Sequence, residues 1–131
     1  MIPEAERWFN QAKKDLEAAS WNFEGKFYAH ACFLSQQAAE KALKAYLYSI
    51  GKRRIITHST YILAKECAQS ENRFNSIWSL CAELDKLYIP SRYPNGLPDS
   101  IPSEVYLKQD AEISIDQSQK VLRLVSNLLF E

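Results

Sequence analysis

The segment QQAAEKALKAYL, from Gln36 to Leu47, constrains the fold more than any other part of the chain. In an α-helix, at about 100° per residue, its apolar and polar residues fall on opposite sides. The apolar arc holds Ala31, Leu34, Ala38, Ala42, Ala45, Tyr46 and Ile50, and the polar side holds His30, Gln37, Lys41, Lys44 and Tyr48. Alanine lets a neighbouring helix approach to the short end of the range of about 8–10 Å. The pattern therefore predicts the central helix of a bundle.

Further helical patterns, separated by glycine and proline breaks, extend this prediction along the chain. The first predicted helix runs from about Pro3 to Gly25, and the second ends at Gly51. A third begins near Ser59, and a fourth has an apolar side from Phe74 to Tyr88. The last begins between Ser103 and Asp110 and ends at Phe130. No segment shows a sustained period of two. We therefore expect one all-α domain over residues 1–131, an up-and-down bundle of four principal helices plus a shorter one.

The composition of the chain indicates a globular protein and argues against a general DNA-binding or membrane protein. Hydrophobic residues make up 47% of the chain and charged residues 24%, which is typical of a globular protein. Sixteen basic residues balance sixteen acidic ones, so general DNA binding is not expected. The N-terminal residues lack the pattern of a secretion signal, and no apolar run is long enough for a membrane span, so we expect a cytoplasmic protein without membrane contact.

Cysteine and aromatic counts give two more expectations. Cys32, Cys67 and Cys81 lie on predicted helices without C-x-x-C spacing, so we expect buried free thiols and no metal or other cofactor. Three tryptophans and seven tyrosines exceed what so small a bundle easily buries. A homodimer is therefore expected.

The proline-rich loop from Ile89 to Pro102 contains the strongest candidate for a binding site. Prolines at every fourth position exclude a regular helix there, and long loops in small domains are often functional. Arg92 and Tyr93 lie inside this loop, where an arginine can bind phosphate while the ring stacks on a base. In the alternative interpretation, Tyr93 packs on the bundle and Arg92 pairs with a carboxylate of Asp85, Asp99 or Glu104.

Two other groups of charges have both an ordinary and a functional interpretation. Lys52, Arg53 and Arg54 follow the second helix, where basic residues favour the helix dipole, or they form a phosphate-binding corner with His58. The central helix carries Glu40, Lys41 and Lys44, which ordinarily lie on its solvated side. In the alternative, Gln37, Lys41 and Lys44 line a groove that faces the loop or a second subunit, where the two lysines could bind phosphate.

The order and spacing of several short motifs resemble the HEPN domain family over nearly the whole chain. These are Trp8, Ala12 and Leu16; Tyr28-Ala29; Ser35 to Ala45; His58-Ser59; Arg92-Tyr93-Pro94; and Asp110-Ala111. The resemblance implies a nucleotide- or RNA-binding module that works with a nucleotidyltransferase partner, in a toxin–antitoxin-like or defence system. The alternatives are a metal-independent ribonuclease at a dimer interface and a non-catalytic dimerisation or adaptor bundle.

HEPN ribonucleases carry an arginine, four to six intervening residues and a histidine, usually at the start of a late helix. Arg53 and His58 match this spacing but precede the third predicted helix. No histidine follows Arg92, and without an imidazole there is no obvious general base for attack by a 2′-hydroxyl. The sequence therefore predicts weak nuclease activity or none.

Overall fold

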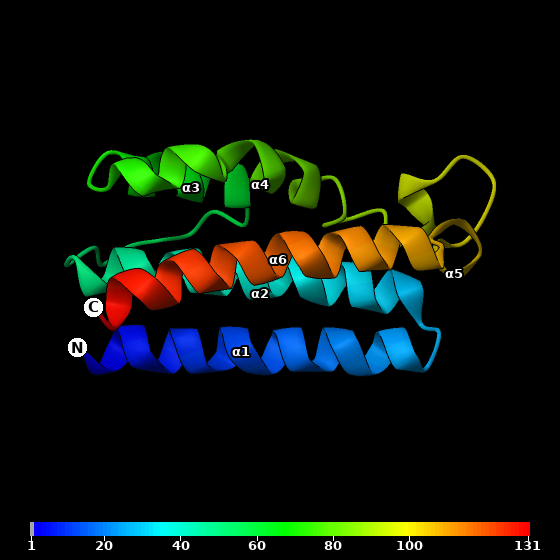
Figure 1. The fold of residues 1–131 in the computed structure, drawn as a ribbon. Coiled ribbons are helices and arrows are strands. Elements are labelled where there is room, and N and C mark those ends of the chain that lie inside the picture. Colours follow the sequence, from blue (N-terminus) through cyan, green and yellow to red (C-terminus); the bar gives the residue numbers. More distant parts are fainter. Residues whose placement is uncertain (1) are drawn as a thin grey trace.

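The computed structural model describes residues 2–131, and its regular secondary structure is helical throughout this range (Figure 1). Three helices of 22 residues form the body of the molecule: α1 (Pro3–Glu24), α2 (Tyr28–Ser49) and α6 (Lys108–Leu129). The shorter elements are α3 (Thr60–Ala68), η1 (Asn72–Ser76), α4 (Trp78–Asp85), η2 (Pro94–Gly96) and α5 (Pro102–Val105). The prediction of an all-helical bundle is confirmed.

The three long helices are packed side by side, with α3 and α4 forming a short layer along one edge (Figure 1). The chain reverses direction between α1 and α2, but α6 runs in the same direction as α2. The loop after α4 makes this possible because it carries the chain back to the end at which α2 begins. Both termini of the chain therefore lie at the other end of the bundle, where α2 ends.

Helix α2 is the centre of the bundle, as its alanine pattern predicts. Ala38, Ala42 and Ala45 are fully buried, and α2 packs against both α1 and α6. The charged residues of this helix are more buried than a side that faces solvent would be. Glu40 and Lys44 are 3% and 4% exposed, so their interpretation as solvated residues is wrong.

The ends of α2 and α3 follow the local chemistry of the sequence. Gly51 has a φ of +94°, a left-handed conformation that suits glycine after a helix. Ser59 precedes α3 as predicted, and its hydroxyl accepts a 3.1 Å hydrogen bond from the amide of Ile62.

The segment from Phe74 to Tyr88 is less regular than predicted. Phe74 belongs to the 3₁₀ helix η1, whereas Tyr88 follows the end of α4 at Asp85. Both rings still point toward the bundle, since Phe74 packs on Tyr46 and Tyr88 packs near Phe33. The apolar spacing thus identified the inward side chains correctly, but not the break in the helix.

No helix among residues 2–131 combines the length and the hydropathy required to cross a bilayer.

Candidate functional site

Asp85, at the end of α4, connects that helix to the beginning of α3. Its carboxylate accepts hydrogen bonds of 2.7 and 3.1 Å from the amides of Thr60 and Tyr61. The hydroxyls of Ser59 and Thr60 also donate to it, at 2.7 and 2.6 Å. One carboxylate thereby satisfies several amide and hydroxyl donors at the start of α3. This arrangement fixes the backbone next to His58.

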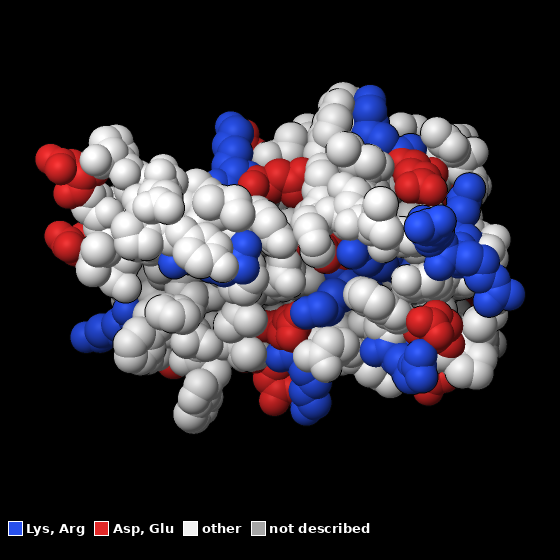
Figure 2. All heavy atoms as spheres, turned by 180° about the vertical axis from the view of Figure 1, so that it is seen from behind, with Lys and Arg blue, Asp and Glu red and all other residues white. Residues whose placement is uncertain are grey.

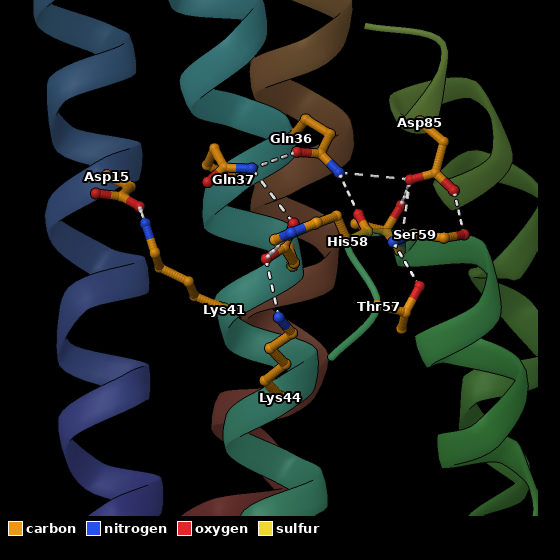
Figure 3. Close-up of polar contacts among 11 residues, drawn as sticks. Asp15, Gln36, Gln37, Lys41, Lys44, Thr57, His58, Ser59 and Asp85 are labelled. Carbon is orange, nitrogen blue, oxygen red and sulfur yellow. Dashed lines mark hydrogen bonds and ion pairs between the residues drawn. The ribbon is translucent and has the colours of Figure 1, made fainter. Parts of the chain in front are cut away.

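Gln36 connects the same region to α2 (Figure 3). Its side-chain amide donates a 3.0 Å hydrogen bond to the backbone carbonyl of His58, and its oxygen accepts one of 2.8 Å from Gln37. Gln36 is fully buried, so these bonds satisfy a polar group that would otherwise be costly inside the bundle. The segment before α3 is therefore held against the middle of α2.

Glu40 is the centre of a small buried ionic cluster. Its Oε2 atom lies 3.1 Å from Lys44 Nζ and 3.3 Å from His58 Nδ1 (Figure 3). Lys44 also lies over the ring of Trp8, 5.6 Å from its centroid. The His58 side chain is 59% exposed, although its Nδ1 faces Glu40. A buried carboxylate therefore orients an imidazole at the surface, an arrangement suited to proton transfer.

Tyr88 brings His58 and Arg92 to one place. The imidazole stacks on the Tyr88 ring with a centroid distance of 5.3 Å and an interplanar angle of 16°. The Arg92 guanidinium carbon lies 4.6 Å from the centroid of the same ring. His58 and Arg92 are 34 positions apart in the chain, and the tertiary fold places both against a third residue.

Arg92 lies in an aromatic cage formed by Phe33, Tyr88 and Tyr93. Its guanidinium carbon is 4.4, 4.6 and 4.8 Å from the three ring centroids, respectively. Its Nε donates a 3.0 Å hydrogen bond to the carbonyl of Tyr88. All three distances are within the range of about 6 Å for cation–π contacts, and together with the hydrogen bond they hold the guanidinium in one position.

Within residues 2–131, no carboxylate lies within 4.0 Å of the Arg92 guanidinium. The alternative that Arg92 pairs with Asp85, Asp99 or Glu104 is therefore wrong. Tyr93 is 48% exposed rather than packed into the core. A positive charge held by aromatic rings without a carboxylate partner is available to an anionic ligand.

A pocket of about 420 Å³ opens beside this arginine, between the first turns of α2 and the proline-rich loop. Phe33 and His30 line it on the α2 side, Arg92 and Pro94 line it from the loop, and Ser103 lines it from α5. The loop is closely packed here, because a Cβ atom at Gly96 would lie 2.9 Å from the backbone of Pro90. The pocket thus has a cation, an aromatic wall and a closely packed loop backbone beside it.

The basic cluster after α2 occupies a different part of the surface. Lys52, Arg53 and Arg54 are all exposed in the segment that follows Gly51, and Lys52 lies 4.0 Å from Glu66. Lysine and arginine side chains gather at this end of the molecule, where acidic groups are interspersed (Figure 2). Among residues 2–131, no hydrogen bond joins Arg53 to His58, and the imidazole instead faces Glu40.

Lys41 differs from Lys44 in its environment. It forms an ion pair with Asp15 of α1, and its side chain is 25% exposed (Figure 3). Together with Arg7, Trp8 and Gln11 it lines a shallow hollow of about 190 Å³. Lys41 thus lies in a hollow against α1 rather than in a groove that faces the proline-rich loop, and its charge already has a partner.

Sequence reasoning missed the residues that organise this region. The sequence pattern places Tyr88 only on an apolar helix side, does not distinguish Phe33, and offers Asp85 only as a partner for Arg92. A signal for Asp85 was present in the sequence. The run Thr57-His58-Ser59-Thr60 supplies several hydroxyls and amides at a helix start, and such a start needs an acceptor.

The three cysteines are buried free thiols, as predicted. Burial raises the pKa of Cys32 to about 11 and the pKa of Cys81 to about 12, and it raises the pKa of Cys67 as well. A thiol acts as a nucleophile in its ionised form, which burial disfavours here. The cysteines therefore serve as small core residues rather than as reactive groups.

Comparisons with known proteins agree with this architecture. The HEPN domain model matches residues 5–128. A crystal structure of TT1696 from Thermus thermophilus superposes with a TM-score of 0.91 at 32% identity, over 96% of this chain and 98% of that one. The structure of ST0689, an archaeal HEPN homologue, gives a TM-score of 0.79 at 37% identity, over 97% and 98% of the two chains. The chain belongs to the HEPN domain family.

One curated relative has a name that concerns function. The protein called "Putative toxin MJ1304", from Methanocaldococcus jannaschii, is 28% identical over 99% of this chain and 91% of its own length. The chain is thus similar, along nearly its whole length, to a protein whose name includes the word toxin.

Proposed function

We propose that this HEPN domain binds RNA or a nucleotide through a phosphate group held at Arg92. The observation that carries the proposal is the aromatic cage of Phe33, Tyr88 and Tyr93, which positions a guanidinium without a carboxylate partner beside a pocket. Arginine presents several N–H donors in a planar fork that matches phosphate oxygens. Exposed Tyr93 adds a surface on which a base can stack.

The near-neutral charge of the chain makes this local arrangement decisive. Without a strong overall field, attraction to an anion must come from particular side chains. Lys52, Arg53 and Arg54 contribute less specific attraction, because they are exposed and lie away from any defined pocket. Lys41 and Lys44 contribute less still, since Asp15 and Glu40 neutralise them.

The test is a titration of nucleotides and short single-stranded RNA into wild type and Arg92→Ala at fixed low salt. A charge-assisted hydrogen bond is worth about 1.5–3 kcal/mol, so we expect the dissociation constant to rise about tenfold or more in the variant. Arg92→Lys should recover only part of the affinity, because it keeps the charge but loses the fork. Lys14→Ala, which removes an exposed charge from α1, is the matched control.

Thermal melting of each variant separates a binding role from a structural one. Equal affinities of wild type and Arg92→Ala, with equal melting temperatures, would remove Arg92 from the site. Equal affinities with a much lower melting temperature for Arg92→Ala would show that Arg92 only stabilises the loop.

A second candidate function is metal-independent RNA cleavage, which the Glu40–His58 contact favours. The imidazole would take the proton of a ribose 2′-hydroxyl while that oxygen bonds to the adjacent phosphorus. The bond from phosphorus to the 5′-oxygen then breaks, and the leaving oxygen takes a proton from water, which yields a 2′,3′-cyclic phosphate. Arg92, against the same Tyr88 ring, would stabilise the charge on the phosphate.

Incubation with single-stranded RNA in the presence of a chelator tests this second function. We expect slow cleavage or none, because no histidine follows Arg92 at the position typical of HEPN ribonucleases. Any activity should fall to the uncatalysed level in His58→Ala and should persist in Arg53→Ala. The opposite pattern, in which Arg53→Ala abolishes cleavage, would assign the activity to the Arg53 and His58 pair.

We also propose a nucleotidyltransferase partner and a toxin–antitoxin setting. This part of the proposal is supported by the HEPN family assignment and by the named toxin relative. A gene for a small nucleotidyltransferase next to this one, with co-purification of the two products, is the expected result. Purification of the two products as separate species would argue against a stable pair.

A further inference from the structure

The chain between α2 and α3 contains a stretched segment, residues 52–58, which we call the linking segment (Figure 1). Its last carbonyl, that of His58, accepts a hydrogen bond from Gln36, which lies 13 positions before the end of α2 at Ser49. That distance along the helix is about 20 Å at 1.5 Å per residue. Seven residues span at most about 25 Å. The linking segment therefore has to be nearly fully extended to return from the end of α2 to Gln36.

Side chains of the linking segment alternate between solvent and the bundle, as they do along a β-strand. Arg54, Ile56 and His58 are exposed, whereas Ile55 and Thr57 are partly buried. Ile55 packs against the main hydrophobic core, and Ile56 is 80% exposed. The linking segment thus resembles a single strand with one face on the helices, although residues 2–131 contain no sheet.

The backbone of the linking segment has almost no hydrogen-bond partners within residues 2–131. None of the amides from Arg53 to His58 donates a hydrogen bond to the protein, and of their carbonyls only that of His58 accepts one. Backbone polar groups without a protein partner need water or a ligand. An extended chain with free N–H and C=O groups is the kind of edge to which another strand can add.

The first half of the linking segment is basic, and an exposed apolar residue follows it. Lys52, Arg53 and Arg54 are all exposed, and only Lys52 has a carboxylate nearby, that of Glu66 at 4.0 Å. Within residues 2–131, neither arginine lies within 4.0 Å of a carboxylate. Free guanidinium groups followed by the exposed Ile56 suit a ligand that carries carboxylates and an apolar side chain.

We propose that the linking segment binds an extended acidic segment of a partner protein by strand addition. Its row of amide donors and carbonyl acceptors matches another polypeptide backbone, whereas a nucleic acid presents mainly acceptor oxygens along its backbone. A second copy of the linking segment would bring two basic clusters together, so charge favours an acidic partner. The proposal is independent of phosphate binding at Arg92, which lies on another part of the chain.

Fluorescence anisotropy with a labelled peptide of alternating glutamate and valine tests the proposal on the whole protein. A peptide of the same sequence with every backbone amide methylated keeps the charge but cannot donate hydrogen bonds to the linking segment. We expect the first peptide to bind and the methylated one to bind about tenfold more weakly or worse. A peptide of alternating lysine and valine should not bind, because its charge has the same sign as that of the arginines.

Two proline variants test whether the backbone of the linking segment makes the contact. Consecutive amides of a strand point to opposite edges, so Ile56→Pro and Thr57→Pro each remove a donor from one edge. Neither amide has a partner in the free protein. We expect one of the two variants to raise the dissociation constant about tenfold or more. Ile56→Ala and Thr57→Ala, which keep the amides, are the matched controls.

A charge variant completes the test. Arg53→Ala with Arg54→Ala should also weaken peptide binding about tenfold or more. Lys13→Ala with Lys14→Ala removes two exposed charges from α1 and should leave it unchanged. Arg92→Ala should bind the peptide as wild type does, so failure of this proposal and failure of phosphate binding at Arg92 are distinguishable.

Amide hydrogen exchange of the wild type supplies a readout that needs no variant. We expect exchange from Arg53 to His58 to slow when the glutamate–valine peptide is added. Unchanged exchange, equal affinity for the methylated peptide, or proline variants that both fold and bind like their alanine controls would overturn the proposal. Binding of single-stranded RNA that requires Arg53 and Arg54, with no binding of the peptide, would assign the linking segment to RNA instead and would overturn it as well.

Discussion

Replacement of Glu40 by alanine is expected to lower the free energy of unfolding by about 3–5 kcal/mol. Glu40 and Lys44 are almost fully buried, and their side chains lie 3.1 Å apart. Removal of the carboxylate leaves the Lys44 ammonium inside the bundle, over the Trp8 ring and without the carboxylate that pairs with it in the wild type. An unpaired buried charge is among the most destabilising changes that one substitution can cause.

Chemical denaturation of wild type and Glu40→Ala measures this effect. Glu17→Ala, on the exposed side of α1, is the control for loss of a carboxylate and should change stability by less than about 1 kcal/mol. The double variant Glu40→Leu with Lys44→Met removes both charges and keeps the volume, so it should recover much of the loss. Equal stabilities of Glu40→Ala and Glu17→Ala would show that Lys44 finds solvent in the folded chain.

Replacement of Asp85 by alanine is expected to lower the free energy of unfolding by at least about 3 kcal/mol. The carboxylate accepts hydrogen bonds from two amides and two hydroxyls at the start of α3, and bonds to a charged group are worth about 1.5–3 kcal/mol each. Thr60 is fully buried, so its amide would lose its acceptor away from water, whereas its hydroxyl also lies 2.8 Å from the carbonyl oxygen of Cys81. The loss should begin at α3 and extend to the segment that contains His58.

Thermal melting gives the size of this effect, and amide hydrogen exchange locates it. Asp85→Asn keeps one acceptor oxygen and most of the shape, so it should cost less than Asp85→Ala. Exchange should accelerate most at Thr60 and Tyr61, which donate to the carboxylate in the wild type. Faster exchange spread evenly over α1, α2 and α6, without a local effect at α3, would contradict a capping role.

Both substitutions also bear on function because they act on residues that hold His58. Glu40 faces the imidazole directly, and Asp85 holds the turn from which this imidazole projects. The arginine in the aromatic cage depends on neither carboxylate. Binding at Arg92 should therefore survive in any Glu40 or Asp85 variant that remains folded, which separates phosphate binding from proton transfer.

Local sequence was sufficient to identify the helices and the strongest candidate residue. The alanine arc of α2, Pro3 near the start of α1, Gly51 after α2 and Ser59 before α3 each act within a few positions, so their effects can be read from spacing alone. Arg92 was identifiable because proline restrains its loop and no regular helix can form there.

Only the tertiary structure decided which sides of α2 are covered and what surrounds Arg92. Helical period shows that Glu40 and Lys44 share a side, but not that α1 and the segment before α3 bury that side. The aromatic cage likewise combines Phe33 of α2 with Tyr88 and Tyr93, which both lie in the segment after α4. Such contacts depend on how helices pack across long loops, and the pattern within one segment carries no information about that packing.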